Sequence, residues 1–396
     1  MPLADALAGG EPMPSEPNRP RLAYVDGLRG LCALYVLLYH AAGDVRPSGA
    51  FLRAAVQPYQ FGRYAVAVFI VVSGFCLMLP VARSAQGAIP GGLRAFAVRR
   101  ARRLLPAYFC VLIPAIIAVA IVRQGYVPAA GEEADVLRLS AGSVWSHLLL
   151  VHNLRRDWAQ AFDPPMWSVA AEAQIYVLFP LLVMLWRRLG MRGLLPLVVA
   201  AGLAPHFLLP PQSNLDWTCP WYLGLFGFGM AAACARGILG IRALKRWPWG
   251  FGAALPAAIA CAWIARNPYA PMGQLWLPDI LLGAAAAAML AGLYAAMGAA
   301  SRGPIAAQGW RYVSSVLEHP AARRSGAISY SLYLLHAPVL WLFSGALTSL
   351  HVGGDTAIVL QLAIGAPVAV SCAYLFYLAI ERPASQWRLA VVRPHG

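Results

Sequence analysis

The residues best suited to chemistry lie in one apolar stretch near the N-terminus, residues 24–43 (YVDGLRGLCALYVLLYHAAG). The stretch is long enough to cross a bilayer, yet it carries Asp26, Arg29 and His40. Ionisable groups in a spanning segment are costly unless they are paired or hydrated, so they indicate a functional site. Arg29 and His40 are eleven residues apart, which puts them on one helix face about 16 Å apart along the axis. The pattern predicts a fixed cation at one end of a helix and a proton-transfer group at the other.

Two interpretations are open for each of these groups. His40 is either a base that takes a proton from a hydroxyl or a structural histidine that is hydrogen-bonded between helices. Asp26 and Arg29 are three residues apart and can form an ion pair. That pair either anchors the end of the helix or contacts an anionic ligand. The intramembrane setting favours function for His40.

A second motif is an arginine cluster in the segment FAVRRARRLLPAYF, residues 96–109. It contains two overlapping RxxR pairs, Arg99 with Arg102 and Arg100 with Arg103. Arginine binds phosphate in a bidentate manner, so the cluster is a candidate site for a phosphate-bearing ligand. The alternative is an ordinary positively charged collar at the cytoplasmic end of a span.

Polar residues also recur inside two later apolar stretches. In PPMWSVAAEAQIYVLFP, Ser168, Glu172 and Tyr176 are four residues apart and share one face. We expect Glu172 at a depth near that of His40, where it orients the imidazole or packs against a neighbouring helix. Trp167 precedes this stripe, and Ser73 in VFIVVSGFCLMLP lies beside Gly74, where backbones can approach closely.

The second of these stretches is GAISYSLYLLHAPVLW. Ser329, Tyr333 and His336 lie on one of its faces, and Tyr330 adjoins them. The packing interpretation is the stronger one for His336. We therefore expect these side chains to support a site rather than to do its chemistry.

Composition restricts the class of protein. The chain has 396 residues, of which 60% are hydrophobic and 12% charged, and its net charge is +15. A soluble domain has about twice that charged fraction. The basic residues lie between apolar runs, so they indicate membrane topology and not nucleic-acid binding. The seven cysteines show no paired spacing, which predicts neither a disulfide framework nor a metal site.

The fold class that follows is an all-α polytopic membrane protein with about ten spans. The spans are roughly 24–43, 63–82, 104–123, 167–186, 193–209, 218–235, 248–265, 276–298, 326–347 and 357–380. With both termini in the cytoplasm, the cytoplasmic segments hold 22 of the 31 Lys and Arg residues and the opposite side holds eight. Residues 1–20 are expected to be a disordered cytoplasmic tail, 21–385 the membrane domain and 386–396 a second cytoplasmic tail.

Six segments in this order resemble the acyltransferase 3 family of bacterial integral-membrane O-acyltransferases. They are YVDGLRGLCALYVLLYH, VFIVVSGF, RRARRLLPAYF, WSVAAEAQIYVLFPLL, ISYSLYLLHAPVL and IERP. The resemblance covers about residues 20–385 and implies a catalytic histidine at His40, paired with Arg29 in the first span. It also implies that the RxxR arginines help to bind acyl-CoA. The family's WSxxxE element is matched by Trp167, Ser168 and Glu172, although the second acid that many members carry is Ala173 here.

The resemblance implies transfer of an acyl group, expected to be acetyl, from cytoplasmic acetyl-CoA to a hydroxyl of an extracytoplasmic glycan or glycolipid, such as exopolysaccharide or O-antigen. His40 would be the general base or the acyl carrier, and the protein would lie in the bacterial inner membrane among its lipids. One alternative is an acyltransferase that acts on a macrolide-type or lipid acceptor. Another is a proton-coupled transporter, because intramembrane charges also mark ion pathways. No inverted repeat supports that second alternative.

Overall fold

The computed structural model describes residues 22–43, 47–125, 135–209, 215–246, 249–267, 270, 272–297 and 305–386. Within these residues the regular structure is entirely helical, which confirms the all-α prediction. Both predicted tails lie outside them, except for Gln386. The main helices are α1 (Ala23–Ala42), α2 (Ala50–Val56), α3 (Arg63–Arg83), α4 (Gly92–Gly125), α6 (Ala141–Leu148), α7 (Arg156–Ala159), α8 (Met166–Leu208), α9 (Tyr222–Arg246), α10 (Trp249–Arg266), α11 (Trp276–Met297), α12 (Ile305–Leu317), α13 (Pro320–Ala327) and α14 (Ser329–Ser349).

The last helical stretch is built from five pieces. They are α15 (Gly354–Leu360), a π-helical turn (Gln361–Gly365), α16 (Ala366–Phe376), a second π-helical turn (Tyr377–Glu381) and α17 (Arg382–Gln386). A π-helical turn holds one residue more than an α-helical turn, and such turns occur frequently at functional sites.

Six helical stretches among the described residues are long and apolar enough to cross a membrane. They are Ala50–Arg83, Gly92–Arg123, Met166–Leu208, Trp276–Ala295, Ser329–Ser349 and Gly354–Gln386. The chain is therefore a multi-pass membrane protein, as expected. Each of the ten predicted ranges coincides largely with helix, but the count of ten and the side of each terminus stay predictions. The ranges 167–186 and 193–209 both fall in α8, whose backbone is non-helical at Gly190.

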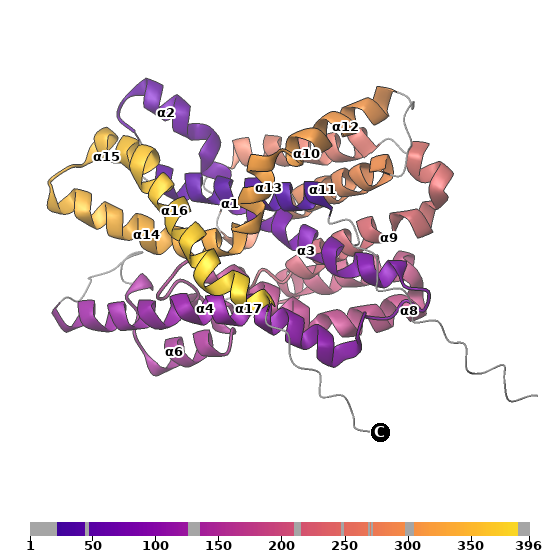
Figure 1. The fold of residues 1–396 in the computed structure, drawn as a ribbon, viewed down its shortest axis with the longest axis horizontal. Helices are drawn as coiled ribbons and strands as arrows, with labels where there is room; N and C mark the ends of the chain where they lie inside the picture. Colours follow the sequence, from indigo (N-terminus) through magenta and orange to yellow (C-terminus); the bar gives the residue numbers. More distant parts are fainter. Residues whose placement is uncertain are drawn as a thin grey trace, which may run out of the picture.

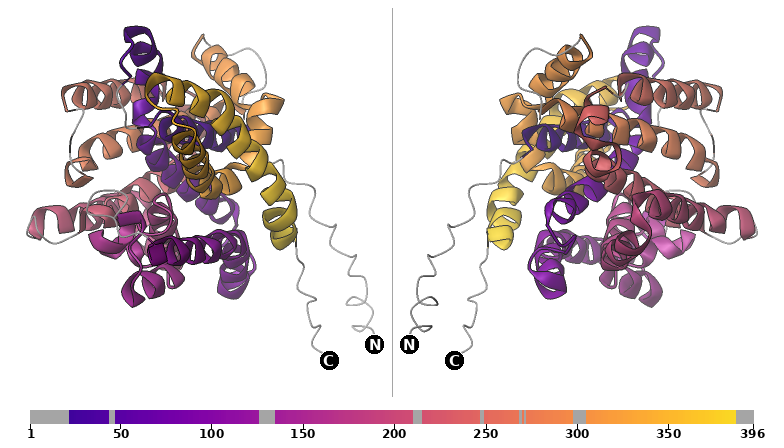
Figure 2. Two further views of the ribbon diagram at one scale, coloured as in Figure 1. Left: turned by 90° about the vertical axis from the view of Figure 1, so that its left-hand side faces the viewer. Right: turned by 90° about the vertical axis from the view of Figure 1, so that its right-hand side faces the viewer.

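Helix α1 lies inside the bundle. Figure 1 shows α1 and α3 in the middle, with α4, α6 and α8 along one side and α10, α11 and α12 along the other. The side views in Figure 2 show the indigo α1 enclosed by later helices. Its neighbours are α3, α12, α13 and α14. The helix that carries Asp26, Arg29 and His40 is thus packed against four other helices.

Glycines let the central helices touch through their backbones. A β-carbon added to Gly74 of α3 would lie 2.2 Å from the carbonyl oxygen of Phe226, and one added to Gly229 of α9 would lie 1.9 Å from that of Val71. The close approach at Gly74 is the one that the sequence predicts, because small residues at helix interfaces let membrane helices pack closely.

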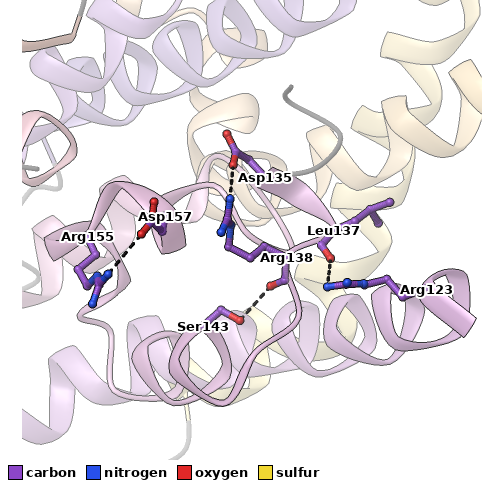
Figure 3. A network of polar contacts seen from close by, with 7 residues as sticks. All are labelled: Arg123, Asp135, Leu137, Arg138, Ser143, Arg155 and Asp157. Atoms are coloured by element: carbon purple, nitrogen blue, oxygen red, sulfur yellow. Dashed lines mark hydrogen bonds and ion pairs between the residues drawn. The ribbon is translucent and has the colours of Figure 1, made fainter. Parts of the chain in front are cut away.

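The segment between α4 and α8 is held by a polar network, shown in Figure 3. Arg138 donates to Asp135 at 3.1 Å, and the Ser143 hydroxyl donates to the Arg138 carbonyl at 2.9 Å. Arg123 of α4 donates to the Leu137 carbonyl at 3.3 Å, which ties the segment to the end of that helix. The middle of this segment forms α6 and a 3₁₀ turn, His152–Leu154.

Candidate active site

His40 lies in the last turn of α1, beside a second histidine. The ring of His336 on α14 lies 4.9 Å from the ring of His40, measured between centroids, at an interplanar angle of 45°. The Nδ1 of His336 is 3.1 Å from the Leu332 carbonyl oxygen, one turn earlier on the same helix. A carbonyl only accepts, so Nδ1 donates and Nε2 carries the lone pair of the neutral ring. That Nε2 is buried without a hydrogen-bond partner, so His336 presents an unused acceptor in the surroundings of His40.

Glu172 is held from two sides. Its Oε1 accepts a hydrogen bond from the Ser73 hydroxyl of α3 at 2.6 Å and another from the Tyr176 hydroxyl, one turn along α8. The guanidinium of Arg100 lies 5.6 Å from the centre of the Tyr176 ring, within the range of a cation–π contact. Ser73 is thus a polar partner of Glu172, in addition to lying beside the glycine contact. The predicted orienting of His40 by Glu172 stays a prediction.

Glu172 also faces a narrow cavity of about 40 Å³ between α1, α3, α8 and α14. Its lining contains both polar and apolar side chains. It is lined by Arg29, Val66, Phe69, Ile70, Ser73, Ser168, Val169, Glu172, Ser329, Tyr330 and Tyr333. Seven sequence-predicted residues therefore meet at this one place, although they come from four different helices: Arg29, Ser73, Ser168, Glu172, Ser329, Tyr330 and Tyr333.

A larger cavity of about 430 Å³ adjoins the narrow one, since Arg29 and Ser329 line both. Its lining contains four arginines and two carboxylates. The lining residues are Asp26, Arg29, Arg103, Pro320, Arg323, Arg324, Gly326, Ala327, Ser329, Tyr377, Glu381 and Ser385. Formal charges in the wall sum to a positive value, which suits an anionic ligand. Asp26 and Arg29 both face this cavity, so their surroundings resemble a ligand site more than a simple helix anchor.

The predicted arginine cluster is divided by the helix faces of α4. Arg103 lines the large cavity and Arg100 lies over Tyr176, so this RxxR pair points inward. Arg99 is exposed and donates to the Pro90 carbonyl at 2.7 Å, while Arg102 is partly exposed. The structure therefore brings one of the four cluster arginines into the cavity that holds Arg29.

The remaining predicted residues connect helices. The Ser168 and Tyr333 hydroxyls are 2.6 Å apart, and both contact the Pro165 carbonyl, which joins α8 to α14. The Tyr330 hydroxyl donates to the Leu104 carbonyl of α4 at 2.9 Å. Trp167 is buried against the rings of Trp217 and Tyr222.

Glu381, which lies in the IERP segment, holds the start of α14. Its carboxylate accepts from the backbone N–H of Ser331 at 3.2 Å and from the Ser331 hydroxyl at 2.5 Å. The residue at the N-cap of α14 is Ile328, which cannot cap with its side chain. A carboxylate at a helix N-terminus satisfies a free donor and interacts favourably with the helix dipole.

Sequence reasoning missed two features of this region. Arg323 and Arg324 were counted only as topology signals, although both line the large cavity. A buried ion pair joins Arg63 of α3 to Asp279 of α11 at 3.3 Å, and the indole of Trp221 donates to the same carboxylate at 2.9 Å. The signal for this pair was available, because Asp279 is an acidic residue in an otherwise apolar stretch.

A second buried polar group lies outside the six candidate spans, between α6 and α8. The rings of His147 and His152 stack at 3.8 Å, nearly parallel. Burial lowers the pKa of His147 to about 4, and burial together with His147 lowers the pKa of His152 well below its usual value. Burial raises the pKa of Asp163 well above its usual value, and neither of its carboxylate oxygens has a partner. All three groups are therefore disposed to be uncharged. Among the described residues, no group of three or more His, Cys, Asp or Glu side chains is placed to hold a metal ion.

Comparisons with known proteins identify the family of the chain. The sequence pattern of the Acyltransferase domain family, acyltransferase 3, matches residues 22–378. Nodulation protein 10 of Rhizobium leguminosarum bv. viciae is 26% identical over 221 residues, covering 52% of this chain and 58% of that protein. No solved structure matches. The family match spans almost all of the bundle, including every residue of the two cavities except the last few of the final helix. The chain therefore belongs to the acyltransferase 3 family, a family of membrane transferase enzymes.

Proposed function

We propose that the protein transfers an acetyl group from acetyl-CoA to a hydroxyl of a glycan or glycolipid on the far side of the bacterial inner membrane. The observation that carries the proposal is the pair of adjoining cavities beside α1. Arg29 lies where the two meet, in the N-terminal half of the helix, and His40 lies in its last turn. Arg29 and His40 are about 16 Å apart along the helix, which suits a donor with a polyanionic end and a long thin arm.

The residues of the large cavity fit the anionic end of such a donor. Arg29, Arg103, Arg323 and Arg324 present guanidinium groups, which bind phosphate in a bidentate manner. The narrow cavity is lined by Phe69 and Ile70 as well as by hydroxyls, so it offers apolar contact for a short part of a thin chain. In this arrangement the thioester would lie beyond Tyr333, toward His336 and His40.

The reaction then needs one base and one proton path. The acceptor hydroxyl gives its proton to His40 as its oxygen attacks the acyl carbonyl carbon. The C–O bond forms, the C–S bond breaks, and the proton passes from His40 to the leaving thiolate. Neutral His336 would accept a hydrogen bond from the second ring nitrogen of His40, an arrangement that holds a catalytic imidazole in one tautomer. Glu172 would balance the charge of Arg29 in the interior.

The test is transfer of radiolabelled acetyl from acetyl-CoA to host membrane glycans in proteoliposomes, with wild type compared with His40→Ala. Label in glycan only with intact His40 is the expected result. Equal label with both proteins would remove His40 from the chemistry. If neither protein transfers label but both exchange protons or solutes, the transporter alternative is favoured.

A further inference from the structure

Two arginines that line the large cavity belong neither to the first predicted span nor to the arginine cluster in residues 96–109. Arg323 and Arg324 lie on α13, the short helix immediately before α14. Both are exposed side chains at the cavity wall, whereas Arg29 and Arg103 are partly buried. The wall therefore has an inner pair of arginines next to the narrow cavity and an outer pair toward the surface.

Protein groups leave these arginines available to a ligand. Within the described part of the chain, the side chains of Arg29, Arg103, Arg323 and Arg324 make no hydrogen bond or ion pair. Of the two carboxylates in the wall, Glu381 is engaged by Ser331 at the start of α14. An arginine without a partner beside a cavity keeps its five N–H donors free for an anion.

The position of α13 against α1 is set by backbone contact. A β-carbon on Gly326 would lie 1.9 Å from the carbonyl oxygen of Asp26, and one on Gly30 would lie 2.5 Å from the backbone nitrogen of Gly326. A third glycine, Gly27, faces the Leu317 carbonyl at the end of α12 in the same way. Because Gly27 and Gly30 flank Arg29 in the sequence, the contact that positions α13 also brings Arg323 and Arg324 to the cavity that Arg29 lines.

We propose that Arg323 and Arg324 bind the 3′-phosphate at the nucleotide end of the donor and make the protein selective for a 3′-phosphorylated donor. The proposal rests on the proposed function and specifies the residues that bind each phosphate of the donor. The order of groups along the donor is thioester, arm, diphosphate, ribose and 3′-phosphate. An arm in the narrow cavity puts the diphosphate next to Arg29 and Arg103. The 3′-phosphate, at the far end, then falls at the outer pair.

The experiment measures binding of radiolabelled acetyl-CoA and of 3′-dephospho-acetyl-CoA to the full-length protein in nanodiscs. Wild type is expected to bind acetyl-CoA about tenfold more tightly, since a charge-assisted contact to phosphate is lost with the dephosphorylated donor. The double variant Arg323→Gln/Arg324→Gln should bind acetyl-CoA about tenfold more weakly. Its affinity for the dephosphorylated donor should stay within about twofold of wild type, because the inner pair is intact.

A matched control is Arg311→Gln on the neighbouring helix α12, an exposed arginine outside the cavity lining. It removes one positive charge nearby and should leave the preference between the two donors unchanged. Equal weakening of both donors by the double variant, or binding of both as in wild type, would overturn the assignment of the outer pair while leaving the proposed function intact. Wild type that binds neither donor would overturn both.

Discussion

The unpartnered Nε2 of His336 lies in the surroundings of His40, with the two rings 4.9 Å apart on different helices. His336→Leu is expected to lower kcat by at least about tenfold, the range of a lost proton-transfer partner, without raising KM for acetyl-CoA. His336→Gln should recover part of that loss, because its amide oxygen still accepts a hydrogen bond. Steady-state kinetics in proteoliposomes provides the measurement, with His351→Asn at an exposed turn as control. Equal kcat in the Leu and Gln variants would argue for a packing role.

Glu172 offers a test of charge against hydrogen bonding. Glu172→Gln keeps an acceptor oxygen for Ser73 and Tyr176 but removes the negative charge. If the carboxylate supports the catalytic centre, kcat should fall by about tenfold or more while the melting temperature stays near that of wild type. Ser73→Ala removes one hydrogen bond from the same oxygen and should cost about 1 kcal/mol of stability. Wild-type kcat in Glu172→Gln would make Glu172 a structural residue.

The backbone contact between α1 and α13 predicts a steric effect at Gly326. Gly326→Ala puts a methyl group where the Asp26 carbonyl oxygen lies, so the helices must separate, at a cost of about 1–3 kcal/mol. Acetyl-CoA affinity should fall as well, because the outer arginines move away from Arg29. Gly345→Ala on α14 has open space around the added β-carbon and should be neutral or slightly stabilising. The two variants are compared by melting temperature and donor binding in nanodiscs.

The ion pair between Arg63 and Asp279 should matter far more than a surface pair with the same separation. Asp279 is fully buried, and Asp279→Ala removes a charge next to a cation inside the bundle, which typically costs about 3–5 kcal/mol. Arg155 and Asp157 are also 3.3 Å apart, but both are more than half exposed. Asp157→Ala should cost less than about 1 kcal/mol. Similar melting temperatures for the two variants would contradict this ranking.

The stacked histidines predict that stability falls with acid. His147 has a pKa of about 4 in the folded protein, whereas an exposed histidine in the unfolded chain has a pKa of about 6.5. Between these values the unfolded chain binds more protons, so stability is complete above about pH 6.5 and falls as the pH decreases toward 4. The loss from His147 approaches about 3 kcal/mol at the acid end.

His147→Phe is the variant that isolates this effect. It keeps a flat ring against His152 and removes the proton uptake, so its melting temperature should fall less between pH 7 and pH 5. Asp163 contributes with the opposite sign, because its raised pKa lets the folded state hold a proton that the unfolded chain releases above about pH 4. That contribution is present in both proteins and cancels in the comparison. Parallel pH profiles would show that His147 does not carry the effect.

Much of the helical layout was predictable because hydropathy and proline or glycine positions act locally. The predicted range 24–43 is helical as α1 at Ala23–Ala42, and the range 248–265 is helical as α10 despite Pro256, although neither is among the six candidate spans. The break at Gly190 separates two ranges that were predicted as separate spans. The short helix α13 was not predicted as a separate element, because its residues were divided between a loop and the span 326–347. The position of α13 depends on its contact with α1, and no periodic pattern in the sequence indicates that contact.

The distinction between local patterns and contacts between distant segments also applies to the site. The bond between Glu172 and Tyr176 follows from their spacing of one helical turn, and the shared face of Arg100 and Arg103 follows from theirs. The bonds between Glu172 and Ser73, and the approach of His336 to His40, join helices that are far apart in the chain. Periodicity gives the face of a helix but not the neighbour that the face meets. The sequence alone therefore does not reveal that His336 lies beside His40.

The two π-helical turns in the last helix have a consequence for insertions and deletions. Each turn accommodates one extra residue, which rotates everything after it by about 100° relative to an uninterrupted α-helix. Between the turns, α16 packs against α14; after the second turn, α17 packs against α4, and Glu381 reaches Ser331. One helical stretch thus packs against two different neighbours, because the part after the second π-helical turn is rotated relative to the part before it. Deleting a single residue from 377–381 would leave an unbroken helix that matches α14 but turns the residues facing α4 and the large cavity away from them.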